Sequence, residues 1–169
     1  QQQFLYTVME FQPLLYQVAM AGLSPADIAS PIRSLLSKYA NISVLQGVAE
    51  KVIGAEKKVI CDIGTFEYDY LILACGARHS YFGHEEWEAF APGLKTLNQA
   101  TEIRCRVLSA FEKAESCRDA AEIKKALTFV IVGGGPTGVE LAGAIGEMSR
   151  FTLKRDFRNI DASQTRVIL

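Results

Sequence analysis

The sequence is short of several features that would point to particular classes of protein. Its 169 residues include 18 basic and 19 acidic side chains, so the net charge is −1 and no broad basic patch indicates nucleic-acid binding. The longest strongly apolar runs, such as YLILACGA, are far shorter than the roughly 18 residues that a membrane-spanning helix needs. No secretory signal opens the chain. We therefore expect a cytoplasmic protein with one ordinary core or two smaller ones.

Cysteine is also sparse, and its spacing excludes the familiar cysteine-based sites. The cysteines form no C-x-x-C pair and no zinc spacing: Cys61, Cys75, Cys105 and Cys117. In so aliphatic a chain, free thiols in a reducing compartment are a better interpretation than disulfides, and we expect Cys75 to be a packed thiol. His79 and His84 lie beside two glutamates, but solvated loop residues explain them more simply than a metal does. We predict no metal centre.

Apolar spacing and capping residues predict the helices. A short helix is predicted over residues 13–22, and Ser24 starts a second helix, which Pro31 restarts. A longer helix follows a polar linker at 83–96. Its apolar residues recur at helical spacing: Ala100, Ile103, Val107, Phe111 and Ala114.

Between and after these helices the periodicity changes to that of strands. A small meander is predicted from strands at 42–47, 49–54 and 57–62. Residues 70–74 are apolar on both faces, which is typical of a buried strand in a parallel sheet. Residues 127–132 and 166–169 are predicted to be neighbouring parallel strands joined by a helix at about 137–153. Phe4–Met9 has the composition of a further short strand.

The most specific local motif is the run FVIVGGGPTGVELAG at 129–143. Gly133, Gly135 and Gly138 satisfy G-x-G-x-x-G between an apolar strand and a helix, the context in which this motif binds dinucleotides. Gly133 would permit a tight turn, Gly135 would leave room for a pyrophosphate, and Gly138 would let helix and strand approach closely. A tight strand-to-helix turn without a ligand is the alternative, because the sequence stops at Leu169 before an acidic ribose-binding residue appears.

Three further features lie on the predicted last helix or at a predicted strand end. Gly138, Ala142 and Gly146 form a small-residue stripe along which the last helix can lie close to its sheet. Glu140 is the only carboxylate in the first turns of that helix, where stabilising the helix dipole is its simplest role. Gly76 allows the chain to turn at the carboxyl end of the strand at 70–74, where ligands bind in open α/β folds, although a simple strand exit explains it equally well.

Three segments, at 11–33, 68–97 and 129–169, together resemble the type II NADH:quinone oxidoreductases. These are FAD flavoproteins of the two-dinucleotide-binding-domain superfamily, and the resemblance is co-linear from Phe11 to Leu169. It implies an α/β fold with two Rossmann-like dinucleotide-binding domains, incomplete in this chain. Residues 1–92 would belong to the first FAD-binding segment with its β-meander, and 93–169 to the linker helix and the N-terminal half of the NADH-binding domain.

The resemblance also implies roles for individual residues. NADH would be bound by Gly133, Gly134, Gly135, Pro136, Thr137 and Gly138. FAD would be bound by Gln12, Val48, Ala49, Ala74, Cys75 and Gly76. Glu140 would lie near the contact between nicotinamide and flavin and act as a catalytic residue. Cys75 stands where the family has a threonine, which removes a hydroxyl group that could have bonded to the cofactor.

Several parts of the family pattern are not found in this sequence. No glycine fingerprint for FAD precedes residue 11, and the paired cysteines of the related disulfide reductases are missing. We therefore expect an internal fragment of an enzyme that oxidises NADH and passes electrons to a quinone. The resemblance places that enzyme at the cytoplasmic face of the membrane, held by a region outside this chain, and allows a homodimer. The alternatives are a catalytically incomplete nucleotide-binding fragment and a related NAD(P)H-flavin reductase with another acceptor.

Overall fold

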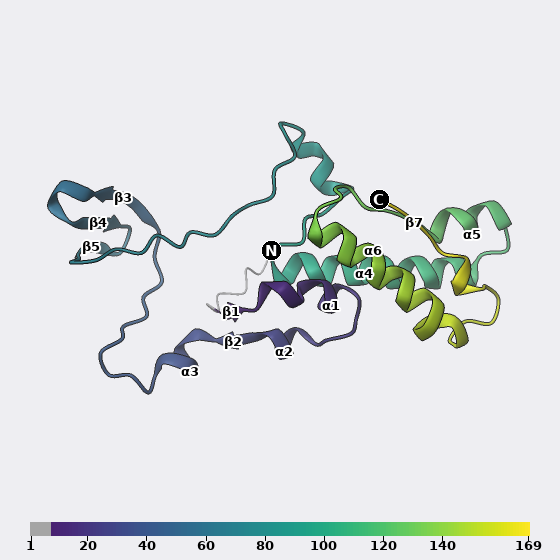
Figure 1. Cartoon of the computed structure of the whole chain (residues 1–169), viewed down its shortest axis with the longest axis horizontal. Coiled ribbons are helices and arrows are strands. Elements are labelled where there is room, and N and C mark those ends of the chain that lie inside the picture. Colours follow the sequence, from purple (N-terminus) through teal and green to yellow (C-terminus); the bar gives the residue numbers. More distant parts are fainter. Residues whose placement is uncertain (1–7) are drawn as a thin grey trace. The chain divides into compact units, whose positions relative to one another are not determined.

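A computed structural model describes residues 8–169 and divides the chain into two compact units (Figure 1). One unit contains Ser30–Arg78, and the other contains Glu10–Ala29 and His79–Leu169. β1 (Val8–Glu10) and β2 (Ala29–Pro31) form a two-stranded sheet. Residues 4–7 of the predicted first strand lie outside the described residues. The domain division predicted after residue 92 concerns a longer protein, and it stays a prediction.

The unit that contains Ser30–Arg78 holds a small antiparallel meander. Its strands β3 (Ala49–Ile53), β4 (Lys58–Cys61) and β5 (Gly64–Glu67) pair in that order. A 3₁₀ turn, η2 (Gly54–Glu56), joins β3 to β4, and α3 (Ile32–Leu36) precedes the meander. None of the described residues from 30 to 78 is fully buried, so the meander is held by its ladder of hydrogen bonds and not by a core of its own.

Two of the strands predicted in this unit do not form. Residues 42–47 form no strand, and β5 takes their place as the third strand of the meander. Residues 70–74 also form no strand, and Tyr70 and Ile72 are 94% and 88% exposed. An apolar strand is buried only when neighbouring strands pair with its edges and other elements cover its faces. No described strand pairs with residues 70–74.

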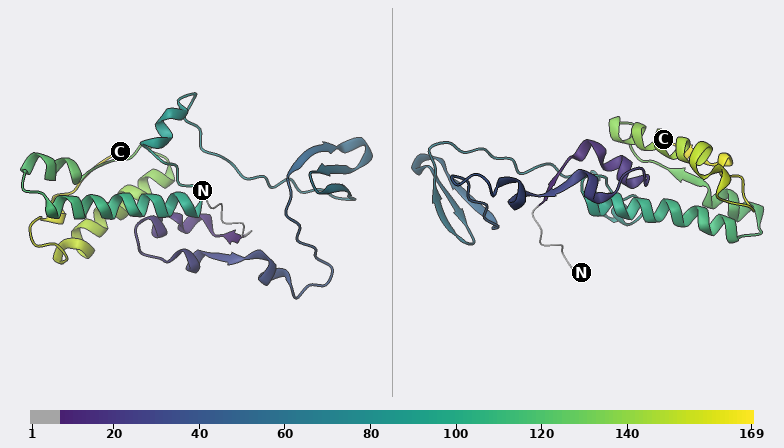
Figure 2. Two further views of the ribbon diagram at one scale, coloured as in Figure 1. Left: turned by 180° about the vertical axis from the view of Figure 1, so that it is seen from behind. Right: turned by 90° about the horizontal axis from the view of Figure 1, so that it is seen from below.

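The other unit is built around α4 (Leu97–Ser116), the long helix seen in both views of Figure 2. Thr96 caps this helix by accepting a hydrogen bond from the Gln99 N–H at 3.3 Å. All its predicted core residues are buried: Ala100, Ile103, Val107, Phe111 and Ala114. The short helix α1 (Leu15–Ala19), preceded by the 3₁₀ turn η1 (Gln12–Leu14), packs against α4. Both predicted helices are therefore confirmed.

Proline and serine shape the chain after α1 as predicted. Ser24 caps α2 (Pro25–Ile28) by accepting a hydrogen bond from the Ala26 N–H, while Asp27 accepts one from the Ser24 N–H at 2.7 Å. The helix then stops, because the residue before Pro31 is restricted to extended conformations. A new helix, α3, begins at Ile32.

The predicted strand–helix–strand unit is confirmed. β6 (Thr128–Val130) and β7 (Arg166–Ile168) are parallel and are connected through α6 (Pro136–Glu147). After α6 the chain continues in a π-helix, η4 (Met148–Thr152), and a 3₁₀ turn, η5 (Leu153–Arg155). A further 3₁₀ turn, η6 (Ala162–Gln164), precedes β7. α5 (Ala120–Ala126) precedes β6.

Aromatic packing joins these elements to α4. The ring of the fully buried Phe111 lies 5.7 Å from the ring of Phe129 in β6 and 5.8 Å from that of Phe157. Removing such a buried aromatic side chain typically costs about 3–5 kcal/mol. The core of this unit therefore fixes β6, and with it the glycine-rich loop that follows.

Candidate functional site

The glycine loop turns sharply between β6 and α6. The Ile131 N–H donates to the Ile168 carbonyl at 2.8 Å, so the chain is still paired with the end of β7 two residues before Gly133. Gly133 then adopts φ +108°, a left-handed conformation that side chains other than glycine rarely adopt. The predicted role of Gly133 in a tight turn is confirmed.

Gly138 is required for a different reason. A Cβ atom on Gly138 would overlap the carbonyl oxygen of Gly133. The first turn of α6 therefore lies directly against the loop, and only a residue without a side chain allows this approach. The predicted close approach of small residues is confirmed at Gly138 but not at Gly146, where a Cβ would meet no atom within 4 Å.

Neither a left-handed backbone nor a close backbone contact requires glycine at positions 134 and 135. Gly135 has φ −74° and ψ 176°, an extended conformation open to any residue. A Cβ atom on either glycine would meet no protein atom within 4 Å. The fold therefore does not explain why glycine stands at 135, whereas the close approach of a ligand to bare backbone would.

The start of α6 offers hydrogen-bond donors in the same place. Gly135 is the N-cap residue and provides no side-chain cap, and Pro136 follows it. The first helical bond runs from the Val139 N–H to the Gly135 carbonyl at 3.0 Å. Within the described part of the chain, the N–H groups of Thr137 and Gly138 find no acceptor. Free N–H groups at the positive end of a helix favour a phosphate group.

A hollow of about 560 Å³ opens beside this loop. One part of its lining comes from β6, the glycine loop and the start of α6, including Val130, Val132, Gly135 and Thr137. Another part comes from the segment 79–95, including Tyr81, Phe82, Trp87, Phe90 and Lys95. The hollow lies within a single compact unit, and its lining is mainly apolar and aromatic.

The segment 79–95 was missed as part of the site, because its proline, two glycines and charged residues indicate a linker. It contains the 3₁₀ turn η3 (Glu85–Ala89). The ring of Trp87 stacks on that of His84 at 4.2 Å, and Phe90 is 84% exposed. The aromatic residues within this otherwise polar segment were the sequence feature that could have indicated its part in the site.

The two histidines of this segment differ in environment. His84 is exposed, as predicted, and its Nδ1 lies 3.1 Å from Glu86. His79 is not the solvated residue that was predicted, because only 27% of its side chain is exposed: its Nε2 lies 3.4 Å from Glu88, and its ring lies against Gly93. No cluster of three or more potential metal ligands occurs among residues 8–169.

Glu140 lies one turn along α6 from the loop. It is exposed, and it makes no hydrogen bond or ion pair with any other described residue. The first turn of α6 contains no acidic residue, and dipole effects fall off within that turn. The structure therefore gives Glu140 little part in stabilising the helix.

The residues predicted to bind FAD are divided between the two compact units. Gln12 lies in one unit, where its Nε2 donates to the Lys95 carbonyl at 3.3 Å. In the other unit, the Val48 N–H donates to Asp62 Oδ1 at 2.8 Å, and the Asp62 N–H donates to the Val48 carbonyl at 3.1 Å. Ala49 pairs with Cys61 in the meander. The backbone groups of Val48 are thus already used.

The segment Ala74–Gly76 suits a cofactor better. All three residues are exposed, Gly76 adopts φ +71°, and a Cβ on Gly76 would meet no atom within 4 Å. Cys75 is a free and exposed thiol, so the prediction of a packed thiol is wrong: the buried strand that would have enclosed it does not form. The prediction that all four cysteines are free is confirmed. The backbone at 74–76 is therefore open to a cofactor, whereas the Val48 N–H and carbonyl are already hydrogen-bonded to Asp62.

Comparison with known proteins agrees with this strand–glycine–helix geometry. The family described as pyridine nucleotide-disulphide oxidoreductase matches residues 5–162. The chain belongs to this family. The family membership confirms the predicted α/β fold of the two-dinucleotide-binding-domain type, of which this chain holds part.

Individual proteins and solved structures are also similar to the chain. It is 48% identical over 163 residues to a type II NADH:quinone oxidoreductase of Mycobacterium tuberculosis, a match that covers 94% of this chain and 35% of that protein. Two solved structures of NDH2 from Plasmodium falciparum, the second in complex with NADH, have TM-scores of 0.79 and 0.77. Both are 27% identical and match 95% of this chain and 34% of theirs. The chain thus spans about a third of the length of these relatives.

Proposed function

We propose that this chain is the NADH-binding part of an enzyme that oxidises NADH and passes the electrons through FAD to a quinone. The observation that carries the proposal is the glycine at 135, which the fold does not require but a pyrophosphate would. The similarity to a type II NADH:quinone oxidoreductase supports the choice of substrates.

The glycine loop would bind NADH through its pyrophosphate. The phosphate oxygens would accept hydrogen bonds from the free N–H groups of Thr137 and Gly138, and the helix dipole would favour their charge. Gly135 would leave the backbone bare so that the phosphates can approach closely. The apolar lining of the hollow would cover the less polar parts of the ligand and exclude water.

The reaction itself requires a hydride acceptor and a proton. When bound, FAD supplies the two-electron carrier between NADH and the quinone. The quinone takes up two protons as it is reduced, and the hydride provides only one of them, so the other must come from water. Glu140 is exposed, carries no other bond among the described residues, and lies one turn from the nucleotide loop, which suits a residue that moves this proton.

The lipid solubility of quinones supports a location of the whole enzyme at a membrane. We propose the cytoplasmic face of that membrane, with a homodimer as one arrangement. Among the described residues, no helix is long and apolar enough to span a bilayer.

Substitution of Gly135 by valine tests the nucleotide site directly. The fold leaves room for a Cβ atom at 135, so the unfolding midpoint should change only by the modest cost of valine at a helix N-cap, whereas the valine would occupy the space of the pyrophosphate. Loss of even one charge-assisted hydrogen bond, of about 1.5–3 kcal/mol, weakens affinity about 10- to 100-fold. Calorimetric titration with NADH measures this loss, and Gly143→Val on the same helix, also in open space, is the control.

Two results would count against the proposal. Equal NADH affinity in Gly135→Val and the unaltered chain would show that the loop does not hold the pyrophosphate. NADH binding without reduction of a soluble quinone by the whole flavin-loaded enzyme would favour a nucleotide-binding protein without turnover, or a reductase with another acceptor.

A further inference from the structure

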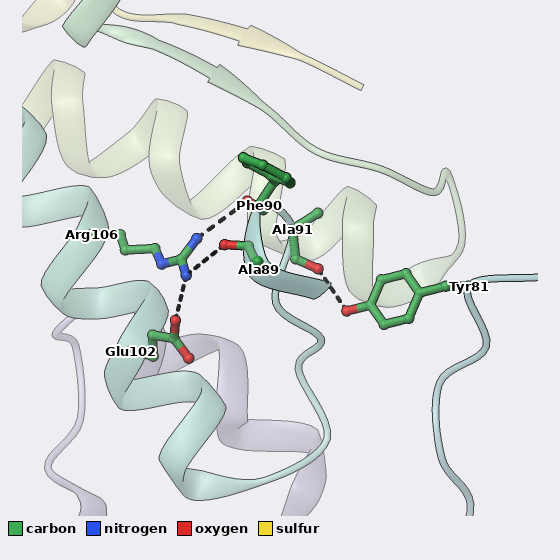
Figure 3. Close-up of polar contacts among 6 residues, drawn as sticks. All are labelled: Tyr81, Ala89, Phe90, Ala91, Glu102 and Arg106. Carbon is green, nitrogen blue, oxygen red and sulfur yellow. Dashed lines mark hydrogen bonds and ion pairs between the residues drawn. The ribbon is translucent and has the colours of Figure 1, made fainter. Parts of the chain in front are cut away.

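Three successive carbonyl groups at the end of η3 and just beyond it are bonded by side chains that come from elsewhere in the chain (Figure 3). Arg106 of α4 donates from Nη2 to the Ala89 carbonyl at 3.0 Å and from Nη1 to the Phe90 carbonyl at 3.2 Å. The Tyr81 hydroxyl donates to the Ala91 carbonyl at 2.7 Å. No backbone N–H among the described residues donates to these carbonyls. Side chains therefore satisfy the acceptors that the end of the turn leaves free.

The guanidinium group of Arg106 is itself fixed in place. Glu102, four residues earlier on α4, accepts a hydrogen bond from the same Nη2 atom (Figure 3). α4 is anchored by its buried apolar face, so Arg106 projects from a rigid element. The planar fork of an arginine can bond two neighbouring acceptors at once, which a lysine cannot do.

Apart from Arg106, the polar contacts of this turn are local ones within the segment 79–95, such as the pair of His79 with Glu88 and the bond of Tyr81 to Ala91. None of the residues from 79 to 95 is fully buried, so packing alone does not determine where this segment lies. Trp87 and Phe90 nevertheless line the hollow that the glycine loop also lines. Leu94 packs against the core, but η3 itself has no buried residue, so polar contacts to rigid α4 help to keep these aromatic side chains in place.

We propose that Arg106 is a positioning residue of the nucleotide site. By holding the carbonyls of Ala89 and Phe90, it keeps the aromatic side chains of η3 and Phe90 in place as a wall of the hollow in which NADH binds. This inference rests on the proposed function, since it assigns the hollow to NADH. Only molecules with the wall in place bind NADH well, so the apparent dissociation constant is the intrinsic one divided by the fraction of such molecules. A tenfold decrease in that fraction therefore weakens binding about tenfold.

The single tryptophan of the chain allows a direct test, because Trp87 lies in the segment that Arg106 holds. Reduced nicotinamide absorbs light in the range where tryptophan emits, so NADH that binds in the hollow quenches Trp87. Titration of the full chain with NADH is compared for Arg106→Gln and Lys113→Gln. Each substitution removes one positive charge from an exposed site on α4, but the side chain of Lys113 makes no hydrogen bond or ion pair with another described residue, and Ser116 bonds only to its backbone carbonyl.

We expect the NADH dissociation constant to rise at least about tenfold in Arg106→Gln and to stay unchanged in Lys113→Gln. Arg106→Lys keeps the charge without the fork and should lie between the unaltered chain and Arg106→Gln. Without NADH, Trp87 in Arg106→Gln should show lower fluorescence anisotropy and faster quenching by acrylamide, while helix content by circular dichroism stays the same.

The outcomes separate the two proposals. Unchanged NADH affinity in Arg106→Gln would overturn the positioning role and leave the proposed function standing. Unchanged anisotropy of Trp87 in the same variant would also overturn it, because the wall would not depend on Arg106. If the unaltered chain does not bind NADH, the proposed function fails and this inference fails with it. Weakened binding in Lys113→Gln as well would show a general effect of charge and overturn the specific role of Arg106.

Discussion

Gly138 lies against Gly133 so closely that a Cβ atom on Gly138 would overlap the Gly133 carbonyl oxygen. This contact brings the start of α6 onto the loop that leaves β6, and the left-handed backbone of Gly133 makes the turn between them possible. Gly135 lies between these two positions with neither constraint. The two outer glycines therefore build the loop, and the middle one leaves it open to a ligand.

Gly138→Ala should destabilise the protein. The added methyl group meets backbone, which cannot move aside as a side chain can, and such overpacking typically costs about 1–3 kcal/mol. Gly143→Ala is the matched control on α6, since its Cβ meets no atom within 4 Å and alanine favours helix by up to about 1 kcal/mol. Urea unfolding should show a loss for Gly138→Ala and no loss for Gly143→Ala. Equal stability of the two variants would contradict the close approach.

Glu140→Gln should alter catalysis and not stability. Glu140 is exposed and unbonded among the described residues, so the free energy of unfolding should change by less than about 1 kcal/mol. In the whole flavin-loaded enzyme, we expect flavin reduction or reoxidation to slow at least about tenfold, because general acid–base roles contribute about 10²- to 10⁴-fold. NADH binding should weaken much less. Stopped-flow measurement of both half-reactions decides it, and unchanged rates in both would remove Glu140 from the mechanism.

Tyr81 should make stability fall at alkaline pH. Burial raises the pKa of Tyr81 above its ordinary value of 10.0, and the nearby carboxylates of Glu88 and Glu85 raise it further. The neutral hydroxyl is favoured in the folded state, so its contribution is fully present below the unfolded pKa and is lost as pH rises through the higher folded pKa.

Tyr81→Phe tests this dependence and the bond to Ala91. The variant should lose about 0.5–1.5 kcal/mol at neutral pH, the net value of one hydrogen bond. Its stability should then fall less steeply above about pH 10 than that of the unaltered chain. Urea unfolding across this range measures both effects, and parallel pH profiles would show that Tyr81 does not contribute.

Glu115→Ala should release the chain before β7. The Glu115 carboxylate at the end of α4 accepts hydrogen bonds from the N–H groups of Arg158 and Asn159 at 3.0–3.1 Å. Hydrogen bonds to a charged group contribute about 1.5–3 kcal/mol, so stability should fall by about that amount. Glu112→Ala, exposed on the same helix, should have almost no effect in thermal unfolding. Equal melting temperatures for both variants would contradict the role of Glu115.

Predictions from the sequence were confirmed where the signal is local. The five apolar residues of α4 are buried because helical spacing alone places them on one face. The capping box at Ser24 and the turn at Gly133 likewise depend on a few neighbouring residues. Strand, glycines and helix in that order were enough to predict β6, α6 and β7 as a parallel unit.

Predictions failed where a residue depends on partners far along the chain. The run at 70–74 has the composition of a buried strand, but burial requires neighbouring strands, and none of those described pairs with it. Cys75 is exposed for the same reason. Residues 42–47 form no strand, and β5 is the third strand of the meander instead. Register and turn geometry decide which strands pair, and the apolar content of one segment does not.

The sequence by itself determined the family, the order of elements around the glycine motif, and the helical face that forms the core, since each depends on residues close together in the chain. Only the tertiary structure distinguished the roles of Gly135 and Gly138, which are equivalent as letters of the glycine motif. The open space around Gly135 and the close contact at Gly138 depend on how α6 lies on the loop. The tertiary structure alone joined Arg106 to the carbonyls of Ala89 and Phe90, since a hydrogen bond across 16 or 17 positions has no periodicity to reveal it.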